Sequence, residues 1–354
     1  MATPVSPDLR DSPFLAACRA EPHDRTPVWF MRQAGRSLPE YRAIRGTGSI
    51  LDAIADPELS AEITLQPVRR YGVDAAILYS DIVVPAHAVG FGVDVKPGVG
   101  PVVEQPFERA ADLQRLRPLE PDEDTPYVLE TVRRVVAEAE VPLIGFAGAP
   151  FTVASYLIEG APSRTYGRTK ALMLGDPGLW HDLMECLADM AIASLRSQIA
   201  AGASAIQLFD SWAGALSPPA YERCVLPHSR RVFEAVADTG VPRIHFGVGT
   251  GEILGLMASA GTDVVGVDWR VPLDEARRRL GPDAVLQGNL DPAVCLGPPD
   301  EIAGVVAAEV ADVLARNGGH PGYVFNLGHG VMPEIDPVVL ERVVEQVHAH
   351  PLDA

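Results

Sequence analysis

The chain has 354 residues, of which 47% are apolar and 21% are charged, a composition typical of a globular protein with a sizeable core. It carries 47 acidic and 29 basic residues, a formal net charge of −18, which argues against a nucleic-acid-binding protein with its broad basic face. No apolar run is long enough for a membrane span, and the start (MATPVSPDLRDSPF) lacks the basic and apolar segments of a secretory signal. The four cysteines, Cys18, Cys186, Cys224 and Cys295, form no CxxC pair. That scatter indicates a reducing, cytoplasmic location and argues against a cysteine-based metal site.

Short apolar runs recur along the chain, with longer helical patterns between them. The runs are too short for helices and too continuously apolar for a sheet with one wet face, so we expect strands buried on both faces. The eight predicted strands are 27–31, 74–80, 142–148, 205–209, 242–246, 264–269, 284–289 and 323–328. Asp56-Pro57, Asp176-Pro177 and Ser217-Pro218 each place a capping side chain before a proline and predict helix starts. The third of these helices is expected to reach about Ala237.

Strands that alternate with helices in this way predict an α/β fold with a single (β/α)8 TIM-type barrel over residues 1–354. A doubly wound open sheet is the alternative, weakened because no GxGxxG motif follows the first strands. We also expect an N-terminal extension over about 1–26 and a β-hairpin excursion near 94–107. No linker divides the chain into further domains.

The segment from Arg25 to Arg45 is basic within this acidic chain. It holds five arginines and one acid, Glu40, so its local charge is +5 − 1 = +4. A solvated helix would pair its arginines with acids at i, i+4 spacing. The segment therefore predicts a site for an anion that is not part of the chain.

Polar residues that follow the strands of a parallel barrel meet at one end of it. The residues placed there are Arg32, Gln33 and Arg36 after the first strand, Asp81 after the second, Tyr156 beyond the third, Ser211 after the fourth and His329 after the last. Singly, most of them have an ordinary interpretation as a surface ion pair, a helix cap or a hydroxyl bonded to the backbone. Together they predict a polar mouth with a basic rim, suited to an anionic ligand. His245 lies inside a strand and is expected to be a core histidine.

Five segments resemble the uroporphyrinogen decarboxylase family and occur in the family's order. They are PVWFMRQAGRSLPEYR (27–42), ILYSDI (77–82), GFAGAPFTVASYLIEG (145–160), LFDSWAG (208–214) and FNLGHGV (325–331). One departure is Ser37, which stands where the family usually has an aromatic residue after QAGR. A packing contact beside the arginines is therefore expected to differ, whereas the arginines themselves are kept.

The resemblance implies a homodimeric (β/α)8 carboxy-lyase of haem biosynthesis in the cytoplasm, with no nucleic-acid or membrane partner. Such an enzyme converts uroporphyrinogen III to coproporphyrinogen III by removing four acetate carboxyl groups, with neither a metal nor an organic cofactor. Carried over motif by motif, the substrate-binding residues would be Arg32, Gln33, Ala34, Gly35, Arg36, Asp81, Tyr156, Ser211 and His329, with Arg45 as a further contact. The catalytic residues would be Asp81, Arg32 and His329.

The chemistry of the implied substrate suggests a role for Asp81. Loss of CO₂ leaves an electron pair, which a pyrrole protonated on carbon can accept because its nitrogen then carries positive charge. A carboxylate facing the inward-pointing pyrrole N–H groups would orient the macrocycle and stabilise that cation. The proton donor stays open: Arg32 is a very poor acid, His329 has a more suitable pKa range, and the substrate or water could also supply the proton.

Two other functions remain as alternatives. One is a cobalamin- or thiol-directed methyltransferase on the same fold. Methyltransferases of the zinc type need a His-x-Cys pair and a distant cysteine, whereas the corresponding position reads His245-Phe246-Gly247. A non-catalytic tetrapyrrole carrier would use the arginines but would have no need of Asp81.

Overall fold

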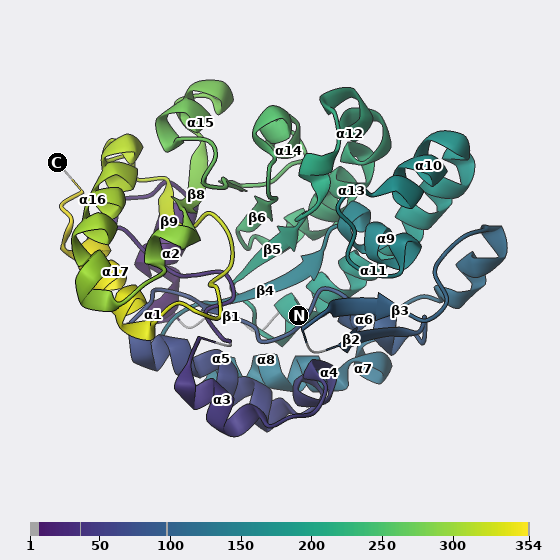
Figure 1. Ribbon diagram of the computed structural model, residues 1–354, viewed down its shortest axis with the longest axis horizontal. Helices are drawn as coiled ribbons and strands as arrows, with labels where there is room; N and C mark the ends of the chain where they lie inside the picture. The colour runs from purple at the N-terminus through teal and green to yellow at the C-terminus, as the bar shows by residue number, and fades with distance from the viewer. Residues whose placement is uncertain (1–6, 36, 97, 353–354) are drawn as a thin grey trace.

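A curved parallel sheet organises the molecule. The computed structural model describes residues 7–35, 37–96 and 98–352, so Arg36 lies outside the described residues. Seven strands run in the order β1-β4-β5-β6-β7-β8-β9, and each neighbouring pair is parallel (Figure 1). They are β1 (Ala76–Ile77), β4 (Leu143–Gly148), β5 (Ala205–Phe209), β6 (Arg243–Phe246), β7 (Val264–Gly266), β8 (Val285–Leu290) and β9 (Tyr323–Leu327).

The segment 27–31 closes the sheet into a barrel. On one side, the Trp29 N–H donates to the Phe325 carbonyl (3.3 Å) and the Phe325 N–H donates to the Pro27 carbonyl (2.8 Å). On the other side, the Asp74 N–H donates to the Val28 carbonyl (2.8 Å), just before β1. The segment thus lies between the last strand and the first, and the predicted (β/α)8 class is confirmed.

This closing segment makes a single β-bridge, Val28 to Phe325, although a full strand was expected there. Its next two N–H groups bond side chains: Phe30 donates to Gln33 Oε1 (2.9 Å) and Met31 donates to Asn326 Oδ1 (3.1 Å). These two N–H groups therefore cannot donate to a neighbouring strand, because each already donates to a side chain.

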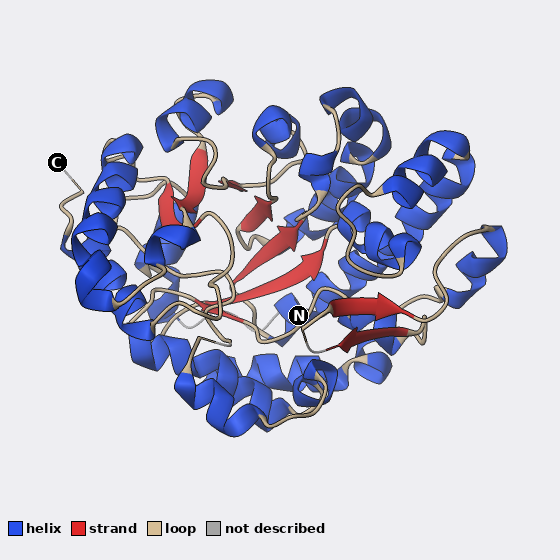
Figure 2. Ribbon diagram, in the orientation of Figure 1, coloured by secondary structure: helices blue, strands red, loops and turns tan. Residues whose placement is uncertain are grey.

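Helices surround the sheet, most of them on its outer face (Figure 2). They are α1 (Pro7–Arg10), α2 (Pro13–Cys18), α3 (Pro39–Arg45), α4 (Ile50–Ile54), α5 (Pro57–Tyr71), α6 (Val84–Ala88), α7 (Pro121–Asp124), α8 (Pro126–Glu138), α9 (Pro150–Glu159), α10 (Gly167–Gly175), α11 (Pro177–Ala201), α12 (Pro218–Cys224), α13 (Leu226–Val236), α14 (Leu254–Ala258), α15 (Leu273–Leu280), α16 (Pro299–Asn317) and α17 (Pro337–Ala349). Short 3₁₀ helices occupy Ala110–Arg115, Ala213–Ala215, Ala237–Thr239, Gly251–Ile253 and Pro292–Cys295. Within the described part of the chain, none of the helices has the length and apolarity needed to cross a membrane.

Two of the three predicted helix starts are capped as expected. The Asp56 carboxylate accepts the Glu58 N–H (3.1 Å) at the start of α5, and Asp176 caps α11 in the same way. The third prediction was wrong in its extent, because the helix expected to run from Pro218 to about Ala237 is two helices, α12 and α13. Pro227, in the first turn of α13, has no N–H to continue the earlier helix.

The segment after α6 leaves the barrel as a hairpin (Figure 2). Strands β2 (Val93–Lys96) and β3 (Gly100–Val103) pair antiparallel and form a separate small sheet. The Val103 N–H donates to the Gly160 carbonyl (2.8 Å), which ties the hairpin to the end of α9.

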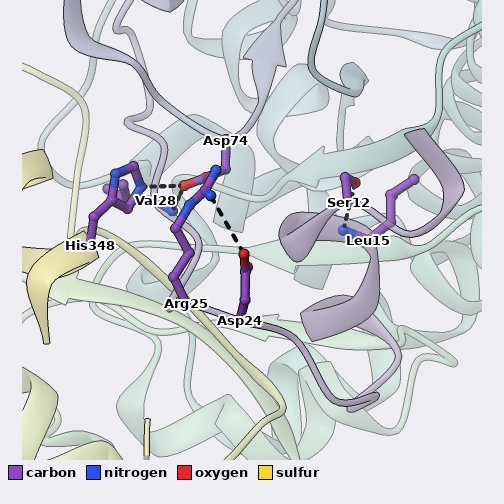
Figure 3. A network of polar contacts seen from close by, with 7 residues as sticks. All are labelled: Ser12, Leu15, Asp24, Arg25, Val28, Asp74 and His348. Atoms are coloured by element: carbon purple, nitrogen blue, oxygen red, sulfur yellow. Dashed lines mark hydrogen bonds and ion pairs between the residues drawn. The ribbon is translucent and has the colours of Figure 1, made fainter. Parts of the chain in front are cut away.

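A buried carboxylate joins the first and last parts of the chain (Figure 3). The Asp74 side chain, 2% exposed, accepts bonds from Arg25 Nη2 (2.7 Å) and the Val28 N–H (2.8 Å) and lies 2.7 Å from His348 Nε2. Arg25 was counted among the arginines without a matching acid, and this part of the prediction was wrong. Its partner lies 49 residues further along the chain.

Side chains fill the inside of the barrel. Trp29 Nε1 donates to Gln287 Oε1 (3.0 Å), and Gln287 Nε2 donates to Gln207 Oε1 (2.9 Å). All three side chains are buried. A ligand of any size must therefore bind at an end of the barrel rather than inside it.

Candidate active site

The carboxyl ends of the parallel strands meet at one end of the barrel, here called the mouth. The segments that leave this end are 32–35, 78–83, 149, 210–217, 247–253, 267–272, 291–298 and 328–336. Arg32, Asp81, Ser211 and His329 lie on four of these segments. The structure thus brings together residues that are up to about 300 positions apart in the sequence.

Arg32 has an exposed side chain and an unusual backbone. Its φ of 61° lies in the left-handed region, which costs a residue with a side chain free energy. The alkyl part of Arg32 packs on Gly330, where a Cβ would lie 2.6 Å from Arg32 Cδ. Among the described residues nothing forms an ion pair or hydrogen bond with its guanidinium group. This cation is therefore available to an anion from outside.

Asp81 forms a turn just before α6 and remains a candidate for the site. Its Oδ1 accepts the Val83 N–H (3.0 Å) just before α6. Burial raises the pKa of Asp81, while the Val83 hydrogen bond and the charge of Arg32 act in the opposite direction. A carboxylate can accept about four hydrogen bonds, so the bond from Val83 leaves Asp81 able to accept others from a ligand.

Tyr156, on α9, forms a wall of the mouth together with Trp212. The two ring centroids are 3.9 Å apart, and the ring of Tyr166 lies 5.0 Å from Trp212. Burial raises the pKa of Tyr156, the charge of Asp81 adds to this and the charge of Arg32 opposes it. The phenol therefore stays protonated at neutral pH and can donate a hydrogen bond.

His329 is half-buried and neutral at pH 7. Burial is the main cause that lowers its pKa. The charges of Arg32 and Arg270 lower that pKa further, whereas the charge of Asp268 raises it. Its Nδ1 accepts the Gly330 N–H (2.6 Å), so the neutral ring carries its proton on Nε2. A neutral imidazole of this kind can donate one hydrogen bond to a ligand.

The glycines on either side of His329 allow close packing, as the sequence predicts. A Cβ on Gly328 would lie 2.9 Å from Trp269 Cβ, and Gly330 contacts Arg32. The last loop thus rests on the loops after β7 and after the closing segment.

The other predicted site residues have different surroundings. Gln33 is fully buried, and its Nε2 donates to the Ala75 carbonyl (3.0 Å), so its side chain joins the arginine loop to β1 instead of facing the mouth. Ala34 and Gly35 are half-buried backbone of the same loop. Arg45 Nη1 donates to the Gly48 carbonyl (2.7 Å) at the end of α3. Ser211 is half-buried directly after Asp210.

The loop after β7 supplies two residues that the sequence analysis missed. Asp268 is buried and accepts bonds from the Gly249 N–H, the Arg270 N–H (3.0 Å) and Arg270 Nη1 (2.7 Å). The Arg270 guanidinium lies 3.9 Å from the ring centroid of Trp269. Their position in the sequence could have indicated them, because polar residues at the end of a barrel strand lie at the mouth. Asp268 and Trp269 end the predicted strand 264–269, and Arg270 follows it.

A second missed feature is the buried pair Asp210 and His245. Asp210 Oδ1 accepts the Thr152 hydroxyl (2.9 Å), while Asp210 Oδ2 and His245 Nε2 lie 3.9 Å apart. Neither of these two atoms has a hydrogen-bond partner within the described residues. Burial raises the pKa of Asp210 to about 7 and lowers that of His245 to about 4. His245 is thus a core histidine as expected, and its Nε2 lies beyond hydrogen-bond distance of Asp210.

Metal-ligating side chains do not gather in the described ranges. No group of three or more His, Cys, Asp or Glu residues there could hold a metal ion. The thiols of Cys18 and Cys295 are buried, and burial raises the pKa of each.

Comparisons with known proteins agree with this architecture. The family model "Uroporphyrinogen decarboxylase (URO-D)" matches residues 9–350. A curated uroporphyrinogen decarboxylase of Salinispora tropica is 61% identical over 342 residues, covering 96% of this chain and 91% of the relative. One of Streptomyces griseus is 62% identical over 339 residues, covering 96% and 92%.

The fold is also found in a solved structure. A methyltransferase from Methanosarcina mazei matches with a TM-score of 0.75 and covers 95% of this chain and 97% of its own. At 22% sequence identity this likeness concerns the fold alone. The family model and the curated relatives decide the assignment: the chain belongs to the uroporphyrinogen decarboxylase family.

Proposed function

We propose that the chain removes the four acetate carboxyl groups of uroporphyrinogen III and gives coproporphyrinogen III in haem biosynthesis. Membership of the family makes it a carboxy-lyase. The observation that carries the proposal is the grouping of four residues at the mouth: the charge of Arg32 acts on Asp81, Tyr156 and His329, and the charge of Asp81 acts on Tyr156. Within the described residues Arg32 forms no ion pair, whereas the substrate brings eight carboxylates.

Binding starts with the arginines. A guanidinium group can hold a carboxylate through two parallel hydrogen bonds, and Arg32 is free to do so. We assign Arg36, from its sequence position alone, to a second carboxylate. Tyr156 and His329 each add a neutral donor, and Ser211 supplies a hydroxyl beside them.

Asp81 is the centre of the reaction in this proposal. The pyrrole N–H groups of the macrocycle point inward, and the carboxylate would accept hydrogen bonds from them. When the pyrrole is protonated on carbon, the same carboxylate lies against a cation. This charge stabilises the intermediate that receives the electron pair released with CO₂.

His329 fits a binding role better than that of proton donor. Its lowered pKa leaves it without an acidic proton to give at neutral pH. Arg32 holds its protons too tightly to be a useful acid. We therefore assign the proton on the pyrrole carbon to water or to the substrate's own carboxyl groups.

We also propose that the chain works as a single-domain homodimer in the cytoplasm. The scattered cysteines and the family resemblance support this proposal. Size-exclusion chromatography with light scattering at working concentration should give twice the chain mass of 37.8 kDa. A monomer at that concentration would contradict the assembly.

The decisive experiment is anaerobic incubation of chelator-treated protein with reduced uroporphyrinogen III, followed by oxidation and chromatography of the products. We expect seven-, six-, five- and four-carboxyl porphyrins to appear in turn without added metal. Tight binding with no loss of carboxyl groups would identify a carrier instead. If the protein neither binds nor decarboxylates the substrate, the methyltransferase alternative would be tested next.

A further inference from the structure

The loop after β7 places another cation, Arg270, near the mouth. Arg270 has a side chain that is 51% exposed, whereas its partner Asp268 is 1% exposed. Asp268 Oδ2 accepts Arg270 Nη1 (2.7 Å), and Asp268 Oδ1 accepts the Arg270 backbone N–H (3.0 Å). The ion pair is thus buried on the acid side and open on the arginine side.

The guanidinium of Arg270 is held in a fixed plane. It lies 3.9 Å from the centroid of the Trp269 ring, a favourable cation–π distance. Only Nη1 is used by Asp268, and the other side-chain nitrogens have no partner in the described residues. A planar group fixed by a ring and an acid loses little conformational entropy when its remaining N–H groups bind a ligand.

Arg270 lies close to the candidate active site. The Trp269 ring meets the His329 ring edge-on, with centroids 6.3 Å apart. Arg270 and Arg32 both lower the pKa of His329 through their charges. Two arginines from loops far apart in the sequence therefore act on the same imidazole.

We propose that Arg270 forms a further carboxylate subsite, in which its free N–H groups bind one peripheral carboxylate of the macrocycle beside His329. The proposal rests on the proposed function, because it takes a polycarboxylate macrocycle as the ligand. A purely structural role would need only the contact with Asp268, and neither the exposure nor the unused donors would matter.

The test compares Arg270→Gln with a matched control, Arg196→Gln. Arg196 is 47% exposed and pairs with Asp238 (2.8 Å) near the ends of α11 and α13, away from the loops of the mouth. Arg270→Gln should raise KM for uroporphyrinogen III about tenfold with kcat changed less than about twofold, as expected for loss of one charge-assisted bond. Arg196→Gln removes the same charge and should leave KM unchanged.

A second readout concerns His329. Because Arg270 lowers the pKa of His329, its removal should raise that pKa, and NMR titration of the imidazole should show an upward shift in Arg270→Gln only. An unchanged KM in folded Arg270→Gln would overturn the subsite. If that variant fails to fold, Arg270→Lys keeps the charge for Asp268 but loses the planar fork, and a wild-type KM there would equally overturn it.

Failure of the subsite and failure of the proposed function can be distinguished. Affinity for uroporphyrin, the oxidised octacarboxylate, is measured by quenching of its fluorescence and needs no turnover. Weaker binding by Arg270→Gln than by Arg196→Gln supports the subsite even if the wild-type protein released no CO₂. Equal binding by both variants would overturn it.

Discussion

At the scale of single residues, the freedom of Arg32 distinguishes it from arginines elsewhere on the surface. Arg69 pairs with Glu62 (2.8 Å) and Arg243 pairs with Asp263 (2.8 Å). In a chain of net charge −18 most exposed arginines can find an acid, whereas Arg32 forms no ion pair within the described residues. Its availability at the mouth provides the local positive field that a polyanionic substrate needs.

Replacing Asp81 by Asn should separate its proposed catalytic role from its structural one. Asn can still accept the Val83 N–H through its carbonyl oxygen, so the fold should persist. The lost negative charge should lower kcat by about 10²–10³, the cost of removing one preorganised group that stabilises transition-state charge. Product chromatography gives kcat, and circular dichroism checks the fold.

The control for this variant is Asp94→Asn, which removes an exposed carboxylate from the hairpin. It should keep wild-type turnover. Near-normal turnover in Asp81→Asn would refute the cation-stabilising role of that carboxylate.

The buried Asp210 predicts a pH-dependent stability. Its pKa is raised from 3.8 to about 7, so the folded protein binds a proton that the unfolded chain gives up at lower pH. Its stabilising contribution is therefore complete below about pH 4 and is lost as pH rises through 7. Asp210→Asn cannot ionise and should gain stability relative to wild type over this range, on the order of a few kcal/mol.

Urea denaturation of both proteins at several pH values between 4.5 and 8 measures this difference. A gap between wild type and Asp210→Asn that stayed constant with pH would show that Asp210 does not carry the proton. His245 is expected to remain neutral throughout, because its lowered pKa of about 4 lies below the range.

At the scale of elements, glycines decide how the loops of the mouth pack. Gly214 lies against the carbonyl groups of Val248 and Gly249, and Gly328 lies against Trp269. Asp268 binds the Gly249 N–H and so joins the loops after β6 and β7. The loops form a connected rim because small residues stand at their contacts.

Gly330→Ala should therefore affect binding more than folding. The new Cβ would lie 2.6 Å from Arg32 Cδ, 2.8 Å from its Cγ and 3.2 Å from its Cβ, so the whole Arg32 side chain would have to leave its present position. KM for the substrate should rise severalfold, roughly the effect of disturbing one charge-assisted bond, while the unfolding midpoint changes little. Steady-state kinetics and thermal unfolding measure the two effects.

Gly304→Ala provides the comparison, since Gly304 lies within α16 and an added Cβ meets nothing within 4 Å. It should stabilise the helix by up to about 1 kcal/mol and leave KM unchanged. An unchanged KM in Gly330→Ala would mean that Arg32 does not bind substrate from its present position.

At the scale of the whole molecule, the Asp74 network connects the N-terminal segment, the entry to β1 and the C-terminal helix α17. Asp74→Ala would leave the Val28 N–H without its acceptor and Arg25 without its main partner. We expect a loss of about 2–4 kcal/mol in the free energy of unfolding, with KM unchanged. Urea denaturation and steady-state kinetics measure these quantities.

The matched control is Asp24→Ala. Asp24 is 76% exposed and only 4.0 Å from Arg25 Nη1, so its removal should change stability little. Equal stability of the two variants would show that the buried carboxylate does not hold the termini together.

The sequence by itself determined the barrel, and it predicted the end of the barrel at which the candidate site lies. Apolar runs of strand length are local signals, and parallel strands place whatever follows them at one end. Arg32, Asp81, Tyr156, Ser211 and His329 could be found in this way. Arg270 also follows a predicted strand, but it lies in none of the five segments that resemble the family.

Only the tertiary structure decided which polar groups have partners. It paired Arg25 with Asp74, turned Gln33 inward and placed Asp210 against His245. It also replaced a full first strand by a single bridge at Val28. The physical reason is that the free energy of a charged or hydrogen-bonding group depends on its neighbours in space and on how much water it loses. Neither the neighbours nor the loss of water can be read from sequence spacing.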